Sequence, residues 1–267
     1  DVHVADVSLS ANHIGLSSFH GDDITLNANE IDLNGGDDSF SGTTLSILSA
    51  ATPTIELGGL NDGGAELNFT DRDIAALNAG FTSIHFSSLT TGDSSALTVE
   101  DSGADFSDAL ASHTADEHSG SLHLEAATIQ IHGDLTSHGG RIEIDAGEHG
   151  TLLVSAGVDV SDTDPGDSGG TVHLLGERIG LYGGARVDAS GDTGGGEVLI
   201  GGDDHGANDS IHNASSVWIG SDVEVHADAI HHGDGGKIVV WSDDVTQHFG
   251  SLTARGGSLS GAGGLIE

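Results

Sequence analysis

Cysteine and methionine are absent from this sequence of 267 residues, and only 4% of its residues are aromatic. Without cysteine the chain has no disulfide scaffold and no cysteine-ligated zinc site. A globular core normally uses larger side chains than the Val, Ile, Leu and Ala that make up most of the apolar residues here. Two prolines stand against 43 glycines, which indicates many tight corners in an ordered chain rather than disorder.

Basic residues are scarce as well. Six Lys and Arg oppose 43 Asp and Glu, so the formal net charge is -37. Nucleic acids and anionic membrane surfaces bind clustered positive charge, so the composition argues against both as partners. Apolar runs never exceed about five residues, whereas a helix that inserts into a membrane needs about 20. A body this acidic repels itself, and salt or bound cations reduce that repulsion.

The first 60 residues follow a pattern of short alternating segments. Apolar and polar residues alternate over three to five positions, as in 24–26 and 31–33. Alternation with a period of two predicts strands that turn one face to a core and the other to water. Gly, Asn and Asp separate these segments, and they accept left-handed backbone angles at low cost. The pattern predicts many short strands joined by tight corners.

The second half of the chain repeats a unit in which a Gly-Gly pair precedes a short strand. The pairs fall at 139–140, 169–170, 195–196, 235–236 and 263–264, at intervals of 30, 26, 40 and 28 residues. A strand, a glycine corner and another strand, repeated every 20 to 50 residues, is typical of a solenoid. Strands this short need neighbours for their backbone hydrogen bonds, so we expect successive coils to stack as parallel sheets.

One segment departs from the strand pattern. Thr70 with Asp73 three residues later predicts a helix N-cap, and Ile74 and Leu77 fall on one helical face. We therefore expect one short inserted helix near 70–80 in an otherwise all-β chain.

No linker rich in Pro or Ser marks a domain boundary, so we predict a single continuous β-helical rod over 1–267. The polar segment 101–120 is predicted to be its loosest loop. The sequence begins without an initiator Met or a signal peptide, and we expect it to be an excerpt of a longer protein.

The segment 185–267 carries a family resemblance. It contains GGGEVLIGGDDHG at 194–206 and ends with GDGGKIVVWSDDVTQHFGSLTARGGSLSGAGGLIE, and these strings resemble the repeat of filamentous-haemagglutinin-like proteins. Such proteins are large exoproteins of bacterial two-partner secretion, and residues 67–101 also resemble a segment of them. The resemblance implies a right-handed parallel β-helix that is exported through an outer-membrane partner, folds outside the cell and serves as an adhesive stalk or filament.

We therefore predict a non-catalytic extracellular fibre or stalk segment of a bacterial surface adhesin. The expected partners are other copies or further coils of the same fibre end to end, a host or neighbouring cell surface or glycan, and the outer-membrane secretion partner. The alternative is a secreted β-helical polysaccharide lyase or hydrolase of the pectate-lyase type. Such enzymes concentrate Asp with Lys or Arg in a groove, and six basic residues spread along this chain favour the structural interpretation.

Acidic doublets recur at the predicted corners, and the cofactor that they suggest is calcium, which takes six to eight oxygen ligands. Stacked corners could bring carboxylates of successive coils together. No doublet matches an EF-hand loop or a calcium-binding nonapeptide, and a solvated acidic face is the alternative interpretation. The calcium candidates are Asp22, Asp23, Asp37, Asp38, Asp203, Asp204, Asp243 and Asp244.

No catalytic residue is predicted. The string GDSGG at 166–170 also surrounds the nucleophile of trypsin-like proteases, but its Gly-Gly pair occupies the place of the other glycine corners. No His or Asp motif of a catalytic triad accompanies it, so we interpret it as a turn. The 17 histidines are scattered without an HExxH motif, which argues against a zinc enzyme, and we expect them in surface turns.

Overall fold

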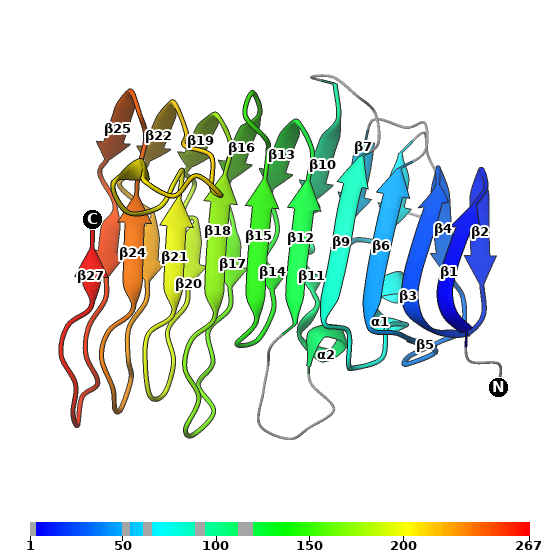
Figure 1. Ribbon diagram of the computed structural model, residues 1–267, viewed down its shortest axis with the longest axis horizontal. Coiled ribbons are helices and arrows are strands. Elements are labelled where there is room, and N and C mark those ends of the chain that lie inside the picture. The colour runs from blue at the N-terminus through cyan, green and yellow to red at the C-terminus, as the bar shows by residue number, and fades with distance from the viewer. Residues whose placement is uncertain (1–3, 50–53, 61–65, 89–93, 112–119) are drawn as a thin grey trace.

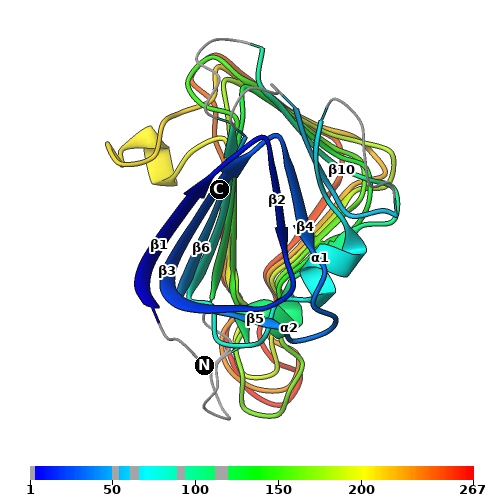
Figure 2. The same ribbon diagram turned by 90° about the vertical axis from the view of Figure 1, so that its right-hand side faces the viewer.

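The chain coils into a parallel β-helix, a rod in which successive turns stack along one axis (Figure 1, Figure 2). In Figure 1 the strands of the largest sheet run upward on the near side, the chain returns downward behind them, and the coils advance from right to left. The coil is therefore right-handed, as predicted. The computed structural model describes residues 4–49, 54–60, 66–88, 94–111 and 120–267.

The largest sheet, called the first sheet below, runs the length of the rod. Its strands pair in register, so that Leu122 lies beside Ile84 on one side and Ile142 on the other. Its path is β1 (Val4–Ser10), β3 (Phe19–Ala28), β6 (Thr44–Ser49), β9 (Ser83–Ser88), β12 (Ser121–Glu125), β15 (Arg141–Asp145), β18 (Thr171–Leu175), β21 (Glu197–Ile200), β24 (Lys237–Val240) and β27 (Leu265–Ile266), and β5 (Phe40–Ser41) pairs with β3 beside it.

Three smaller parallel sheets form the other walls. The second sheet contains β25 (Val245–His248), β22 (Ser216–Ile219), β19 (Arg178–Leu181), β16 (Thr151–Val154), β13 (Thr128–Ile131), β10 (Ala96–Val99), β7 (Thr54–Leu57) and β8 (Leu67–Phe69). The third sheet contains β11 (Ala104–Asp105), β14 (Leu135–Thr136), β17 (Gly157–Asp159), β20 (Arg186–Asp188), β23 (Glu224–His226) and β26 (Ser251–Thr253). A fourth sheet pairs β2 (His13–Leu16) with β4 (Glu30–Leu33).

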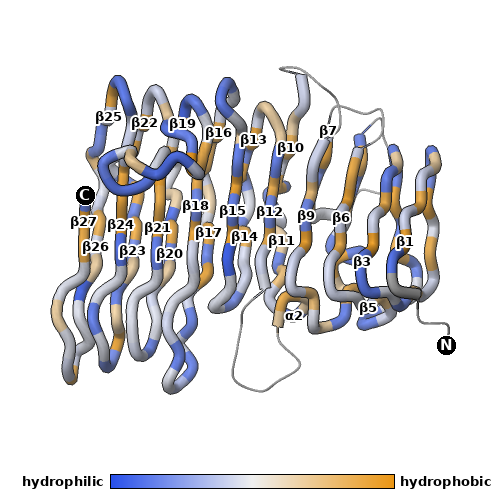
Figure 3. Tube along the Cα trace, in the orientation of Figure 1, coloured by the Kyte–Doolittle hydropathy of each residue, from blue (hydrophilic) through white to orange (hydrophobic). Residues whose placement is uncertain are grey.

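The core is a narrow stack of Val, Ile, Leu and Ala side chains inside the coil. Alternate residues of the strands point inward, and Figure 3 shows the resulting hydrophobic bands along them. Larger side chains gather where helices are inserted. Phe69, Phe86 and Phe106 are fully buried there, and their rings pack edge to face with centroids 5.1 and 5.8 Å apart.

The predicted helix is confirmed, although it is shorter than expected. The helix α1 (Asp71–Ala75) begins at Thr70, whose side chain and that of Asp73 form a capping box. It ends early because Leu77 forms a parallel bridge with Phe40 of β5. In the described part of the chain, no helix is long and apolar enough to cross a membrane.

The prediction that 101–120 is a single loose loop is wrong in part. This segment contains β11 and a second helix, α2 (Ser107–Leu110), and buries Phe106 and Leu110 in the core. The described acidic residues, Asp101, Asp105 and Asp108, are exposed and conceal these apolar positions in the sequence. Residues 112–119 lie outside the described residues.

The Gly-Gly repeat is confirmed as a stacked column of corners. The amide N–H of Thr171 donates to the Gly140 carbonyl at 2.9 Å, and the same bond recurs at each later pair. A Cβ atom on Gly170, Gly196 or Gly236 would lie 1.9 to 2.1 Å from the carbonyl oxygen of the glycine one coil earlier. Only glycine allows successive coils to approach this closely, which is why the pair recurs despite irregular spacing.

Replacement of Gly196 by Ala should therefore destabilise the rod by about 2 to 4 kcal/mol, because the new methyl group meets the backbone of the neighbouring coil. The midpoint of urea unfolding measures the change. The matched control is Gly263→Ala, where the nearest atom to a Cβ is 3.8 Å away and the backbone is not left-handed. Equal losses in both variants would contradict a steric role for the stacked glycines.

Candidate functional site

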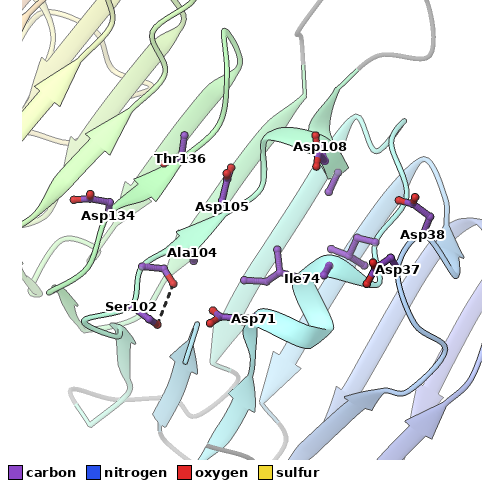
Figure 4. Close-up of a pocket in the computed structure, with 14 residues that line it drawn as sticks. Asp37, Asp38, Asp71, Ile74, Ser102, Ala104, Asp105, Asp108, Asp134 and Thr136 are labelled. Carbon is purple, nitrogen blue, oxygen red and sulfur yellow. Dashed lines mark hydrogen bonds between the residues drawn. The ribbon is translucent and has the colours of Figure 1, made fainter. Parts of the chain in front are cut away.

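An acidic groove begins beside α1 on the outer face of the third sheet (Figure 4). Its first section has a volume of about 590 Å³ and lies among the β4–β5 turn, α1, β11, α2 and β14. The described residues that line it include no Lys, Arg or His. Its carboxylates belong to Asp37, Asp38, Asp71, Asp105, Asp108 and Asp134. So many carboxylates without counter-charges create a negative potential that attracts cations.

The groove continues along the rod in two further sections. The first and second sections share Asp134 and Thr136, and the second and third share Arg186 and Asp188. The later sections have volumes of about 390 and 640 Å³. The lining residues come from successive strands of the third sheet, and these strands stack about 4.8 Å apart along the rod axis. The groove therefore follows the rod axis. Its shape fits an extended ligand better than a compact one.

Carboxylates bind both arginines of the later sections. The guanidinium group of Arg186 donates to Asp188 at 2.5 Å, and Arg255 donates to one oxygen of Asp228 from Nε at 3.0 Å and from Nη2 at 2.6 Å. Burial disfavours the charged form of Asp228, but hydrogen bonds from Arg255 outweigh it and hold the pKa of Asp228 below its ordinary value. The groove thus presents paired ions and hydroxyl groups.

The structure separates the four predicted acidic doublets. Asp37 and Asp38 enter the first section of the groove. Asp22 and Asp23 lie instead on β3, at the other side of the coil, where Asp23 accepts a hydrogen bond of 2.6 Å from the hydroxyl of Thr44. These two doublets therefore do not form one site.

The later doublets lie near the C-terminal end of the rod. Asp203 accepts a hydrogen bond of 2.5 Å from Lys237, which is the main cause of the strongly lowered pKa of this carboxyl group. Asp243 and Asp244 follow β24, and Asp243 accepts a hydrogen bond of 3.1 Å from the indole of Trp241. The carboxylates of Asp203 and Asp243 are therefore already engaged by protein donors.

Two groups of three side chains in the described part of the chain have ligand atoms within 4.8 Å of one another. One group is Asp204, His205 and Glu267, and the other is Asp162, Asp164 and Asp167. Asp204 is the only calcium candidate in either group, so no such group contains two of the predicted ligands. Sequence reasoning missed Glu267, because it lies 62 residues after His205 and no spacing rule connects them.

The prediction that the histidines lie in surface turns is wrong for a column on the first sheet. His85, His123, Glu143 and His173 occupy the same outward position of four successive coils. His173 is only 4% exposed and lies 3.6 Å from Glu143 and 3.2 Å from Glu197. Alternation within each strand could have placed these residues outward, but their stacking depends on coil lengths that the sequence does not reveal.

The GDSGG corner is a turn, as predicted. The amide of Gly170 donates to the carbonyl of Val160, and Gly169 donates to Gly194 in the next coil. Both glycines belong to the stacked column described above.

Comparison with protein-family models gives no match, and none of the curated proteins matches the sequence. The resemblance to filamentous-haemagglutinin-like proteins remains a prediction. The fold itself defines the class of protein, a parallel β-helix with an acidic groove on the outer face of its third sheet.

The calcium hypothesis applies most directly to Asp37 and Asp38, which share the groove with four other carboxylates. It predicts that EDTA at constant ionic strength lowers the melting temperature, because calcium offsets the repulsion between these groups. The double variant Asp37→Asn/Asp38→Asn should lose most of this response. An EDTA response of zero in the wild type would instead favour a solvated acidic face.

Glu143 gives a prediction about acid stability. Its contact with the His123 imidazole, at 3.7 Å, and its ion pair with Arg141 outweigh burial and lower its pKa to about 2, from an ordinary value of 4.5. A lowered pKa in the folded state stabilises the fold above pH 4.5, and this contribution is lost as the pH falls toward 2. Glu143→Gln should cost about 1 to 2 kcal/mol at pH 7 and flatten the pH dependence of unfolding between these values. The exposed Glu148→Gln is the control, and an identical pH profile for wild type and Glu143→Gln would contradict the assignment.

Proposed function

We propose that this chain is a non-catalytic structural segment of an extracellular fibre or stalk in a bacterial surface adhesin. The observation that carries the proposal is the first sheet, whose parallel ladder runs from β1 to β27 through every coil. Each coil contacts mainly its neighbours, so such a rod can be lengthened without a new core. Force along the rod acts on many backbone hydrogen bonds together, which suits a load-bearing element.

The ends of the rod support contacts between coils of neighbouring segments. Among the described strands, β25, β26 and β27 each have a partner on one side only, so their other edge presents unpaired backbone groups. Ile266 of β27 is 45% exposed, although its partner in the previous coil, Ile238, is fully buried. Further coils or another copy of the chain, placed end to end, would cover these groups.

The acidic faces limit the partners that the fibre would contact. With a formal charge of -37, the rod repels anionic membranes and nucleic acids and favours surfaces that carry cations or hydroxyl groups. The groove along the third sheet has the elongated shape and the polar lining that a glycan chain requires. Cell-surface glycans are therefore the proposed contact, and export through an outer-membrane partner follows from the family resemblance alone.

Electron microscopy with a gold-labelled antibody against this chain tests the proposal on the producing cells. We expect label along thin fibres at the cell surface and none on cells from which the chain has been deleted. Label that appears only on dispersed protein in the medium would contradict a role in a surface fibre.

The alternative function is that of a secreted polysaccharide lyase or hydrolase, and the long acidic groove is the observation that favours it. A lyase needs a basic group beside the sugar carboxylate, but the first section of the groove has none among its described residues. Arg186 and Arg255 are already paired with carboxylates. Incubation with acidic polysaccharides distinguishes the two functions, because new unsaturated or reducing ends would establish an enzyme.

A further inference from the structure

A loop and a distant strand meet near the C-terminal end of the rod. The loop contains the short 3₁₀ helix η1 (Asp204–Gly206) and projects from the outer face of the first sheet, close to β27 (Figure 1, Figure 2). Asp204 and His205 come from the loop, and Glu267 directly follows β27. One ligand atom of each lies within 4.8 Å of the others, and His205 Nδ1 is 3.6 Å from a carboxylate oxygen of Glu267.

Hydrogen bonds fix Glu267 and the backbone of the loop, and Nδ1 of His205 contacts a carboxylate oxygen of Asp204 within the cluster. The backbone N–H of His205 donates to the other oxygen of Glu267 at 3.0 Å, which fixes the carboxylate toward the loop. Asp203 accepts a hydrogen bond of 2.7 Å from the N–H of Asp204, and Lys237 binds Asp203 rather than any of the three. Lys237 is therefore engaged outside the cluster.

The backbone at His205 is in an uncommon conformation. Its φ is 56°, and among the described residues only Asp38 shares a positive φ without being glycine. A left-handed backbone is unfavourable for a residue other than glycine. Its imidazole is exposed, contacts the Asp204 carboxylate and lies beside the indole of Trp241, with ring centroids 6.4 Å apart.

We propose that Asp204, His205 and Glu267 bind a zinc ion, which ties the η1 loop to the end of β27. One imidazole nitrogen and two carboxylate oxygens are ligands that Zn²⁺ accepts at about 2.0 to 2.2 Å, with a water molecule in a fourth position. Asp204 and His205 are exposed and Glu267 is partly exposed, so small rotations bring their ligand atoms to these distances and the ion enters directly from solvent. The imidazole distinguishes this cluster from the other one, which contains only carboxylates and would suit harder cations.

Zinc chloride titrated into the tag-free, chelator-treated chain, followed by calorimetry and thermal melting, tests the site. We expect saturable binding of one ion with a rise in melting temperature, and at least tenfold weaker binding in Asp204→Asn and Glu267→Gln. The matched control is His231→Ala, which removes an imidazole 2.5 Å from a single carboxylate, that of Asp192, and should leave the zinc affinity unchanged.

His205→Gly separates metal binding from a structural role. Glycine accepts the left-handed backbone without cost, so the metal-free melting temperature should stay the same or rise while the zinc response is lost. Absence of saturable binding, or wild-type affinity in Asp204→Asn and Glu267→Gln, would overturn the proposal. A lower metal-free melting temperature of His205→Gly with unchanged zinc affinity would assign His205 a structural role and would also overturn it.

Discussion

In-register stacking of parallel strands is the constraint on which the rest of this structure depends. Most strands have two to five residues and would not be stable alone, but each strand inside a sheet completes the hydrogen bonds of the coils on either side. The same register places a side chain over its counterpart about 4.8 Å away. A slip of one residue would turn Leu122 and its neighbours Ile84 and Ile142 from the core to water, so the core and the ladder specify the same alignment.

Stacking also determines how close the many carboxylates of this chain lie to one another. Like charges at equivalent positions of successive coils would repel, and on the first sheet His123 and His173 lie on either side of Glu143 in its column. Elsewhere Lys237, Arg186 and Arg255 each bind a nearby carboxylate. The section of groove beside α1 lacks such compensation among its described residues, so cations are expected to gather there first.

The sequence predicts what is local and misses what depends on coil length. Period-two alternation identifies the strands, the Gly-Gly pairs identify the corners, and Thr70 with Asp73 identifies α1, because each signal lies within a few residues. The helix α2 escapes because Asp105 and Asp108 make its segment read as a polar loop. The histidine column and the two groups of possible metal ligands are not predicted for another reason. Because the coils differ in length, the sequence does not tell which residues stack on one another or meet in space.

Unequal coil length also explains where the functional groups lie. The length of a coil is the number of residues between paired positions of the first sheet. It is 20 from Ser121 to Arg141 and 40 from Glu197 to Lys237. The ladder requires only the strands, so extra residues can leave at a corner without breaking any backbone pairing. The helices α1 and α2 beside the acidic groove and the η1 loop all lie in such long coils. In a rod of this kind, insertions at corners can therefore add binding sites while the stacked strands keep the same structure along its length.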